Sequence, residues 1–437
     1  MRKMSQPGAL QRVLEAAEDA SPVQAVEAVT RELRVLLGAS SSSFLLVDLS
    51  GRALVRLAHT STAGMLTTEE SPDGDRRDLR ESAAVLPFDG GPAEQALRSQ
   101  TVQVLAPGAG AADGTGDWTV LAPVTERGEA IGLLEMVLAE QPDAQVVEDI
   151  RRAAHALAFV VIANRRHTDL FEWGQRSVPF SLAAEIQRRL LPAAFTCEAG
   201  AFTLAAWLEP AARVGGDTFD YSLARDVLHL SVTDAMGHGT DSALTATVCV
   251  GSLRNSRRMG STLLEQVALA NECLVEHAGV VDADGFATGL IGRLDLRTGR
   301  LSVVNAGHVA PYLLRDGEVT VVELPADVPL GMFPGSTYRS TELALQPGDR
   351  LVLVTDGMLE RNAANLDLST ALSTMRAMHP REATRSLADA VLAVAGTTLA
   401  DDATMLVLDW HGGHHRDRVT TAGADDRRAS SATVASL

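Results

Sequence analysis

The second half of the chain consists of short apolar segments divided by tight turns, and this pattern restricts the fold more than any other feature. Dipeptides such as Asp316-Gly317 and Pro347-Gly348 separate the segments, and such dipeptides commonly connect antiparallel strands. We expect strands at 203–207, 227–233, 286–295, 301–304, 312–314, 319–324, 350–355 and 404–410, and helices at 242–258, 262–277 and 381–394. Many antiparallel strands with a few long helices predict two sheets flanked by helices.

The first part of the chain predicts a separate unit, which makes the protein as a whole an α/β (α+β) protein. Its opening helix is expected at 22–37, where apolar residues recur at steps of three and four. Strands are expected at 43–48, 53–58, 101–105, 119–125 and 130–138. The 437 residues provide enough length for two or three domains of ordinary size.

A heptad-like stripe follows this first unit. Apolar residues recur at alternating steps of three and four from Val147 to Phe171, with the polar Asn164 among them. This pattern favours a helix that pairs with a second copy of the chain, in which a buried asparagine fixes the register. It fits equally well a closing helix of the first unit that packs on its own sheet. The two interpretations are not exclusive, and we expect a homodimer.

The patterns together divide the chain into four parts. The N-terminal unit is expected at 1–143 and a helical linker at 144–192, which includes a second amphipathic helix at 180–191 that ends before Pro192. The second globular unit is expected at 193–410. The remaining residues, 411–437, are rich in Gly, Ala, Ser, Arg and Asp without apolar periodicity, which predicts a disordered tail.

Charge and composition exclude several classes of function. The formal net charge of −18 repels phosphate backbones and anionic lipid, so nucleic acid and membranes are not expected partners. Lys3 is the only lysine, which excludes a Walker A loop, a protein-kinase ATP site and Schiff-base chemistry. Three widely spaced cysteines exclude a zinc knuckle and a disulfide framework. No apolar run approaches the length of a membrane span, and we expect a cytoplasmic protein.

Four aspartates of the second unit share one setting, at or beside the end of an expected strand and within three residues of glycine or another aspartate. They are Asp217, Asp234, Asp356 and Asp401. Each one alone is most simply a turn residue, because aspartate at a strand end commonly hydrogen-bonds its own backbone. Together they match the needs of hard divalent cations such as Mg²⁺ and Mn²⁺, which bind carboxylates, carbonyls and water. Two such ions would activate a shared water for displacement at phosphorus.

Five ordered motifs of the second unit carry a family resemblance. They are the run from Ala212 to Tyr221 with its Gly-Gly-Asp, the DAMGHG segment at 234–239, Asn305-Ala306-Gly307-His308, the stretch from Pro347 to Gly357, and Asp401-Asp402-Ala403-Thr404. In order and spacing they resemble the SpoIIE-type (RsbU-like) branch of the PPM metal-dependent serine/threonine protein phosphatases. The resemblance covers about residues 180–410 and implies a PPM-type α-β-β-α sandwich. The segment before it resembles a GAF sensor domain, on shape more than on residues.

The resemblance implies a site for two Mn²⁺ or Mg²⁺ ions. Asp217 and Asp234 inherit metal-binding roles, with Asp234 bridging and Ala235 contributing its carbonyl, and the set is completed by Asp356 and Asp401. Asp402 is the alternative to Asp401. Asp220 is either an additional carboxylate near the metals or a structural residue. As general acid, His238 is weighed against a structural role in its turn, and Arg213 as a phosphate contact is weighed against a surface ion pair.

The function implied is hydrolysis of phosphoserine and phosphothreonine in a protein by a water activated between two metal ions. In this branch the usual substrate is a phosphorylated anti-anti-sigma (STAS) protein in stress or developmental signalling, and a helix pair before the catalytic sheets commonly regulates the enzyme. The helix at 180–191 matches that place, and an unknown ligand or partner of the GAF-like domain would act through the helix at 147–171. Two alternatives are a catalytically inactive signalling scaffold and a phosphohydrolase of a small-molecule phosphate.

Overall fold

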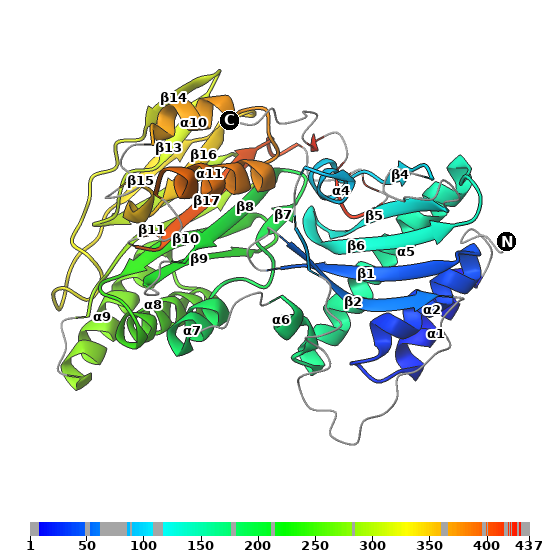
Figure 1. Cartoon of the computed structure of the whole chain (residues 1–437). Helices are drawn as coiled ribbons and strands as arrows, with labels where there is room; N and C mark the ends of the chain where they lie inside the picture. The colour runs from blue at the N-terminus through cyan, green and yellow to red at the C-terminus, as the bar shows by residue number, and fades with distance from the viewer. Residues whose placement is uncertain are drawn as a thin grey trace. The chain divides into compact units, whose positions relative to one another are not determined.

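The computed structural model describes two compact units of the chain, one formed by Met1–Pro179 with Val419–Leu437 and the other by Phe180–Arg418 (Figure 1). The residues described are 8–48, 53–61, 85–87, 90–107, 117–175, 181–210, 215–281, 285–359, 366–395, 399, 401–414, 418, 420, 422–425 and 428–429. Within them, no helix combines the length and the hydropathy needed to cross a membrane.

The first unit is built on one antiparallel sheet of six strands. The strand order is β3-β2-β1-β6-β5-β4. The strands are β1 (Ser41–Val47), β2 (Ala53–Ser61), β3 (Val85–Pro87), β4 (Gln103–Leu105), β5 (Trp118–Glu126) and β6 (Glu129–Leu138). The helices are α1 (Ala9–Asp19), α2 (Ala25–Leu37), α4 (Pro92–Ser99), α5 (Ala144–Asn164) and α6 (Leu170–Gly174), with a 3-10 turn η1 (Arg165–His167).

Helix α5 belongs to the core of this unit. Asp143 caps its first turn by accepting a hydrogen bond from the Val146 amide at 2.8 Å. The side chains of Ile150, Leu157 and Val161 are buried in one cluster with residues of α2, β5 and β6. The stripe therefore packs against its own sheet, as in the closing-helix interpretation. The continuous helix expected to Phe171 ends at Asn164, whose amide donates to the Val160 carbonyl of its own helix at 2.9 Å.

Part of the C-terminal segment also packs in the first unit. The Gly128 amide in the turn between β5 and β6 donates to the Gly423 carbonyl at 2.8 Å. Ala424 and Asp425 are buried. Gly423 has a positive φ of 91°, and a Cβ there would lie 2.0 Å from the Thr125 carbonyl oxygen, so this close approach requires glycine.

The second unit contains two antiparallel sheets, ordered β15-β12-β11-β10-β9 and β14-β13-β16-β17-β8-β7. The strands of the first sheet are β9 (Gly216–Leu223), β10 (Val227–Ala235), β11 (Ala287–Asp295), β12 (Arg300–Ala306) and β15 (Ser340–Ala344). Those of the second are β7 (Thr196–Glu198), β8 (Phe202–Glu209), β13 (Tyr312–Arg315), β14 (Glu318–Val321), β16 (Arg350–Val354) and β17 (Ala403–Trp410). The helices are α7 (Leu182–Leu190), α8 (Thr240–Arg258), α9 (Leu263–Val281), α10 (Leu368–Thr374) and α11 (Pro380–Ala395), with a 3-10 turn η2 (Asp356–Met358).

Buried clusters show the layers of the second unit. Leu406 and Leu408 of β17 share a cluster with residues of β10, β11 and β12, so the two sheets pack face to face. Met405 and Val407 of the same strand pack with α10 and α11, because successive side chains of a strand point to opposite faces. A further cluster joins α8 and α9 to the other sheet. The predicted α-β-β-α sandwich is confirmed.

Strands β7, β9 and β15 are absent from the expectations drawn from the sequence. The sequence of β9 is Gly-Asp-Thr-Phe-Asp-Tyr-Ser-Leu, which is too polar to predict a strand, although its first five residues are buried. As a result Asp217 lies near the start of a strand rather than after the end of one. Pairing with β10 stabilises β9 where the sequence shows no hydrophobic alternation.

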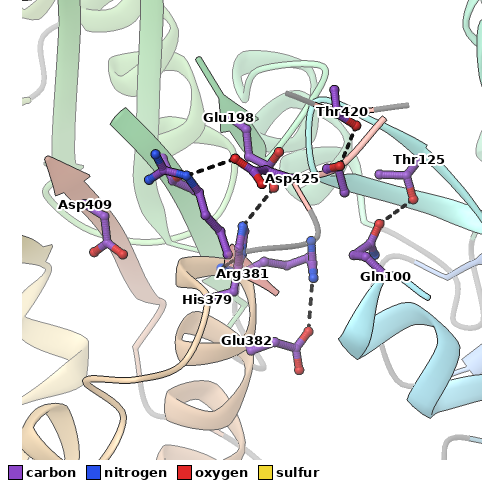
Figure 2. A network of polar contacts seen from close by, with 12 residues as sticks. Gln100, Thr125, Glu198, His379, Arg381, Glu382, Asp409, Thr420 and Asp425 are labelled. Carbon is purple, nitrogen blue, oxygen red and sulfur yellow. Dashed lines mark hydrogen bonds and ion pairs between the residues drawn. The ribbon is translucent and has the colours of Figure 1, made fainter. Parts of the chain in front are cut away.

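Buried polar pairs occur in each unit (Figure 2). In the first, the Thr125 hydroxyl donates to the Gln100 side-chain oxygen at 2.5 Å. In the second, His379 Nε2 lies 3.1 Å from Glu198 Oε1, and both side chains are almost wholly buried. Glu198 also pairs with Arg418. Such pairs satisfy polar groups that burial would otherwise leave without partners.

Candidate metal centre

The edge strand β9 and its neighbour β10 bring Asp217 and Asp234 together in one sheet. Asp217 on β9 and Asp234 on β10 are directly opposite in the antiparallel register, so their Cβ atoms lie within about 5.5 Å of each other by ordinary sheet geometry. Asp217 is 2% exposed and Asp234 is half-buried. Two carboxylates at one buried point repel each other unless a proton or a cation intervenes.

In the other sheet, Asp356, Asp401 and Asp402 lie at the ends of the central strands β16 and β17. Asp356 begins η2, with one residue between it and the end of β16, and Asp401 and Asp402 directly precede β17. Strands β16 and β17 are paired. A Cβ on Gly357 would lie only 1.9 Å from the Asp402 carbonyl oxygen, which shows how closely the two segments approach. The structure thus groups carboxylates that are up to 185 positions apart in the sequence, from 217 to 402.

A hydrogen bond connects the two sheets where these aspartates lie. The Thr355 hydroxyl donates to Asp217 Oδ2 at 2.7 Å, and the same hydroxyl oxygen accepts from the Thr404 amide at 3.0 Å. Thr355 precedes Asp356 by one residue. It therefore links a carboxylate of one sheet to the strand ends of the other.

The pKa values report that these carboxylates interact. Burial, with repulsion from Asp234 and Asp402, raises the pKa of Asp217 well above its ordinary range. Burial, with repulsion from Asp356 and Asp401, raises the pKa of Asp234 to about 7. Each shift reflects the energetic cost of placing several negative charges together, and a bound divalent cation removes that cost.

The donor set fits an incompletely caged divalent ion. Among the described residues, no three histidine, cysteine, aspartate or glutamate side chains already form a closed metal-binding group. Mg²⁺ commonly binds through one or two protein carboxylates and keeps several waters. Clustered carboxylates that do not converge on one point suit such an ion better than a structural zinc site, which requires four tightly arranged ligands.

Backbone groups beside the carboxylates are also placed closely. A Cβ on Gly216 would lie 2.4 Å from the Ala235 carbonyl oxygen, so only glycine allows β9 to approach that oxygen. A Cβ on Gly215 would lie 3.1 Å from Asp402 Oδ2 and 3.2 Å from Asp401 Oδ1. The Gly-Gly-Asp run thus brings the backbone close to two of the carboxylate-bearing segments.

Asp401 and Asp402 differ sharply in their surroundings. Asp402 is 1% exposed, and its Oδ2 accepts hydrogen bonds from Gln187 Nε2 at 2.6 Å and from the Gly215 amide at 3.0 Å. Asp401 is exposed, and its Oδ1 accepts from the Asp402 amide at 2.9 Å. The carboxylate that protein donors leave more accessible is Asp401.

Asp220 lies apart from this cluster in its interactions. Its carboxylate accepts hydrogen bonds from Arg254 at 2.8 and 3.2 Å and from Arg257 at 3.2 Å. Two guanidinium groups already neutralise it. This arrangement corresponds to the structural alternative for Asp220, and we leave it out of the ligand set proposed below.

The remaining sequence candidates are less informative. His238 is exposed in the turn after β10, and Arg213 lies outside the described residues. Gln187 and Thr355 are absent from the candidates drawn from the sequence, although both contact the carboxylate cluster. Gln187 is 3% exposed and lies four residues after the buried Ala183 on the same face of α7, and this position on the inner face of an amphipathic helix is the signal that would have indicated it.

Comparisons with known proteins agree on one family. Residues 224–411 match the family model described as Stage II sporulation protein E (SpoIIE). Phosphoserine phosphatase RsbU of Bacillus subtilis is 23% identical over 233 residues, which are 52% of this chain and 68% of that protein. Phosphoserine phosphatase RsbP of the same organism is 28% identical over 158 residues, 35% of this chain and 38% of that protein.

Similar solved structures include the SiaA-PP2C domain of Pseudomonas aeruginosa. It is 20% identical and the match covers 52% of this chain and 93% of that domain, with a TM-score of 0.44. The chain spans about two thirds of RsbU and less than half of RsbP. Asp234, Asp356, Asp401 and Asp402 lie inside the family match, and Asp217 lies seven positions before it.

Proposed function

We propose, from the match of residues 224–411 to the SpoIIE family model, that the chain is a Mn²⁺- or Mg²⁺-dependent phosphoserine/phosphothreonine protein phosphatase. The observation that carries the proposal is that Asp217, Asp234, Asp356 and Asp401 come from two sheets and lie close enough for their charges to interact, which contributes to the raised pKa values of the first two. Relatives named phosphoserine phosphatases support the same reaction.

The proposed ligands are these four aspartates and the Ala235 carbonyl. Two bound divalent ions would supply the nucleophile by lowering the pKa of a shared water and would orient the phosphate oxygens. Thr355 holds the Asp217 carboxylate by its 2.7 Å hydrogen bond. Asp402 keeps the Gly215 backbone in place beside Asp401. His238, exposed after β10, is the candidate for protonating the leaving serine or threonine oxygen.

The proposed substrate is a phosphorylated protein, a STAS-type anti-anti-sigma factor in the narrowest form of the proposal. The family resemblance and the likeness to RsbU and RsbP support it. A small-molecule phosphate and an inactive scaffold are the alternatives. Retention of all four aspartates argues against the scaffold.

Regulation by the N-terminal unit forms a further part of the proposal. A GAF-like sensor at 1–143 would bind an unidentified ligand or partner, and the segment 144–192 would transmit its state to the phosphatase unit at 193–410. Helix α7 lies within that segment, and its Gln187 contacts Asp402 and the Asp217 carbonyl. A signal that moves α7 would therefore reach two carboxylate-bearing segments.

A cytoplasmic homodimer completes the proposal. The stripe on α5 is mostly buried inside its own unit, so a dimer interface would have to use other surface, such as Phe159, which is 51% exposed on the same helix. Light scattering of the full chain tests this point. A monomer at micromolar concentration contradicts it.

The test of the main proposal is hydrolysis of p-nitrophenyl phosphate by the full chain with Mn²⁺ and with excess chelator. Asp234→Asn and Asp356→Asn should each lower kcat/KM on the order of 10²-fold or more if the carboxylates hold the ions that supply the nucleophile. Asp316→Asn is the matched control, because Asp316 is exposed in a turn remote from the cluster and its φ of 51° suits asparagine.

Three results would contradict the proposal. They are hydrolysis that persists in excess chelator, full activity of both variants, and equal loss in the Asp316→Asn control. The alternatives separate in a second assay, in which the same enzyme is offered a phosphoserine protein and a set of small phosphate esters. Preference for the esters would favour the small-molecule alternative.

A further inference from the structure

The side chain of His308 lies between the two sheets beside the carboxylate cluster. Its Nδ1 is 2.7 Å from the Thr288 hydroxyl oxygen on β11, and its Nε2 is 3.1 Å from the Val354 carbonyl oxygen on β16. Thr288 is the direct register partner of Asp234, and Val354 precedes Asp356 by two residues. One imidazole ring thus contacts the immediate neighbours of two proposed ligands that belong to different sheets.

Chemistry fixes the protonation of this ring. A carbonyl oxygen only accepts, so Nε2 carries the proton and donates to Val354. In the neutral ring Nδ1 then accepts from the Thr288 hydroxyl. Burial lowers the pKa of His308 to about 4, which keeps the ring neutral near pH 7. Both ring nitrogens are therefore used, one toward each sheet.

The Asn305 side chain and a tight turn at Gly307 hold His308 in this place. The Asn305 side chain accepts from the His308 amide at 2.7 Å and donates to the His308 carbonyl at 3.1 Å. Gly307 has a positive φ of 70°, and a Cβ there would lie 2.8 Å from the Pro329 ring. The tight turn between β12 and β13 is thereby fixed on both sides of the histidine.

Apolar packing between the sheets would not by itself fix the distance between the strand ends that carry Asp234 and Asp356. The sheets contact each other through leucine, valine and phenylalanine side chains, and the hydrophobic effect has no direction. Sites that bind ions need their ligands within about 0.5 Å of the working geometry. Thr355 supplies a directional link at Asp217, but nothing in that bond restrains Asp234 relative to Asp356.

We propose that His308 is a positioning residue of the metal centre, which sets the spacing of Asp234 and Asp356 by bridging Thr288 and Val354. The inference rests on the proposed function, because it assigns a role relative to the proposed metal ligands. His308 itself contacts neither ion nor substrate. Loss of such outer partners typically weakens metal binding by 10- to 100-fold, about the range expected here.

The experiment compares two buried histidines of the same unit in the full chain. His379 is 3% exposed and pairs with Glu198. Glu198 is a register partner of Thr203, which pairs with Asp409 near the end of β17 remote from Asp401. His379→Ala therefore removes a similarly buried histidine that does not contact the carboxylate cluster. It serves as the matched control.

Mn²⁺ binding is measured by titration calorimetry, with the thermal midpoint recorded for every variant. We expect both alanine variants to unfold at lower temperature, but only His308→Ala to raise the Mn²⁺ dissociation constant by about tenfold or more. His308→Gln retains an amide donor and a carbonyl acceptor, so it should recover part of the affinity. An unchanged dissociation constant in His308→Ala, or an equal rise in His379→Ala, overturns the inference.

A second variant covers the case in which His308→Ala does not fold. Thr288→Val keeps the shape of the side chain and removes only the hydroxyl on one side of the bridge. It should raise the Mn²⁺ dissociation constant severalfold, and wild-type affinity in Thr288→Val contradicts the inference. If the wild type binds no Mn²⁺ and hydrolyses no ester, the proposed function fails and this inference fails with it. If the wild type binds Mn²⁺ and His308→Ala binds equally well, only the positioning role fails.

Discussion

At the scale of single residues, the adjacent aspartates Asp401 and Asp402 have different surroundings and different proposed roles. Asp402 is buried and accepts from Gln187 and Gly215, whereas Asp401 is exposed beside it. We expect Asp401→Asn to lower kcat on the order of 10²-fold, because it removes a proposed metal ligand. Asp402→Asn retains an acceptor oxygen for both donors and should lower kcat less than tenfold. Steady-state kinetics at saturating Mn²⁺ measure both.

The same pair of variants also tests the assignment in reverse. A larger loss in Asp402→Asn than in Asp401→Asn would exchange their roles. Circular dichroism of both variants excludes unfolding as the cause.

His308 gives the stability of the fold a dependence on acid. Its pKa is about 4 in the folded chain and about 6.5 when unfolded. Between these values the unfolded state binds more protons, so stability is full above pH 6.5 and falls as the pH decreases toward 4. The contribution amounts to about 3 kcal/mol.

Denaturant unfolding at several pH values between 7 and 4 measures this contribution. The decrease in the free energy of unfolding should be smaller in His308→Gln than in wild type by about that amount. Other titrating groups are common to both proteins and cancel in the comparison. Parallel curves for the two proteins would show that His308 is not neutral and buried as described.

The sequence indicated residues of the site better than it indicated their connections. Asp217, Asp234, Asp356 and Asp401 each lie within three residues of glycine or a second aspartate, which is a local signal. The bond from Thr355 to Asp217 joins positions 138 residues apart, and no local pattern encodes it. The burial of Gln187 against Asp402 is likewise a product of tertiary packing. Whether the four aspartates bind metal remains a prediction.

At the scale of elements, η2 and β17 approach so closely that a glycine is required. A Cβ on Gly357 would lie 1.9 Å from the Asp402 carbonyl oxygen. We expect Gly357→Ala to push η2 and its Asp356 away from β17. A misplacement of about 1 Å at a reactive site can cost on the order of 10²-fold in rate. Hydrolysis of p-nitrophenyl phosphate measures that loss.

Gly251→Ala is the matched control for this substitution. Gly251 lies inside helix α8, and no atom lies within 4 Å of a Cβ built there. Alanine is favoured over glycine in a helix interior by roughly 0.5–1 kcal/mol. The control should therefore keep full activity and unfold at a slightly higher temperature. Full activity in Gly357→Ala would contradict the requirement for close approach.

Elements with regular hydrophobic periodicity were predictable, and elements without it were not. The helix expected at 381–394 is observed as Pro380–Ala395, and the strand expected at 404–410 as Ala403–Trp410. Strand β9 is stabilised by pairing with β10. Its sequence is polar and shows no hydrophobic alternation, so the sequence did not predict a strand there. The helix expected to reach Phe171 ends at Asn164. The apolar periodicity extends to Phe171, but the α-helical backbone is interrupted by the 3-10 turn η1 before α6 begins.

At the scale of the whole molecule, the first unit is assembled from two distant stretches of chain. Residues 1–179 and 419–437 form it together. We expect Gly423→Ala to release the C-terminal segment, because a Cβ there would lie 2.0 Å from the Thr125 carbonyl. The Gly128 amide would then lose its acceptor. Hydrogen exchange at Gly128 should accelerate by at least an order of magnitude.

Leu134, in the middle of β6, provides the internal reference. It pairs with Ala122 and with Phe44 in the sheet, away from the turn that Gly423 contacts. Its exchange should be unchanged in Gly423→Ala. Unchanged exchange at Gly128 would show that the segment does not bind there.

The predicted division of the chain did not anticipate this arrangement. A segment rich in small and charged residues predicted a disordered tail, yet Gly423, Ala424 and Asp425 are buried. Small residues without periodicity carry no signal for docking, because what fixes them is the shape of the surface that receives them. The domain boundaries given above accordingly remain a proposal.

The two-segment construction of the first unit has a consequence for synthesis on the ribosome. Domains generally fold as units while the chain emerges from its N-terminus. Residues 1–179 leave the ribosome first, but the segment around Gly423 follows only after the whole of Phe180–Arg418 has been translated. Both units therefore depend on residues that are translated late, because β17 (Ala403–Trp410) lies in the middle of a sheet of the second unit. A chain truncated after residue 418 would contain every segment of the second unit but would lack the part of the first unit around Gly423.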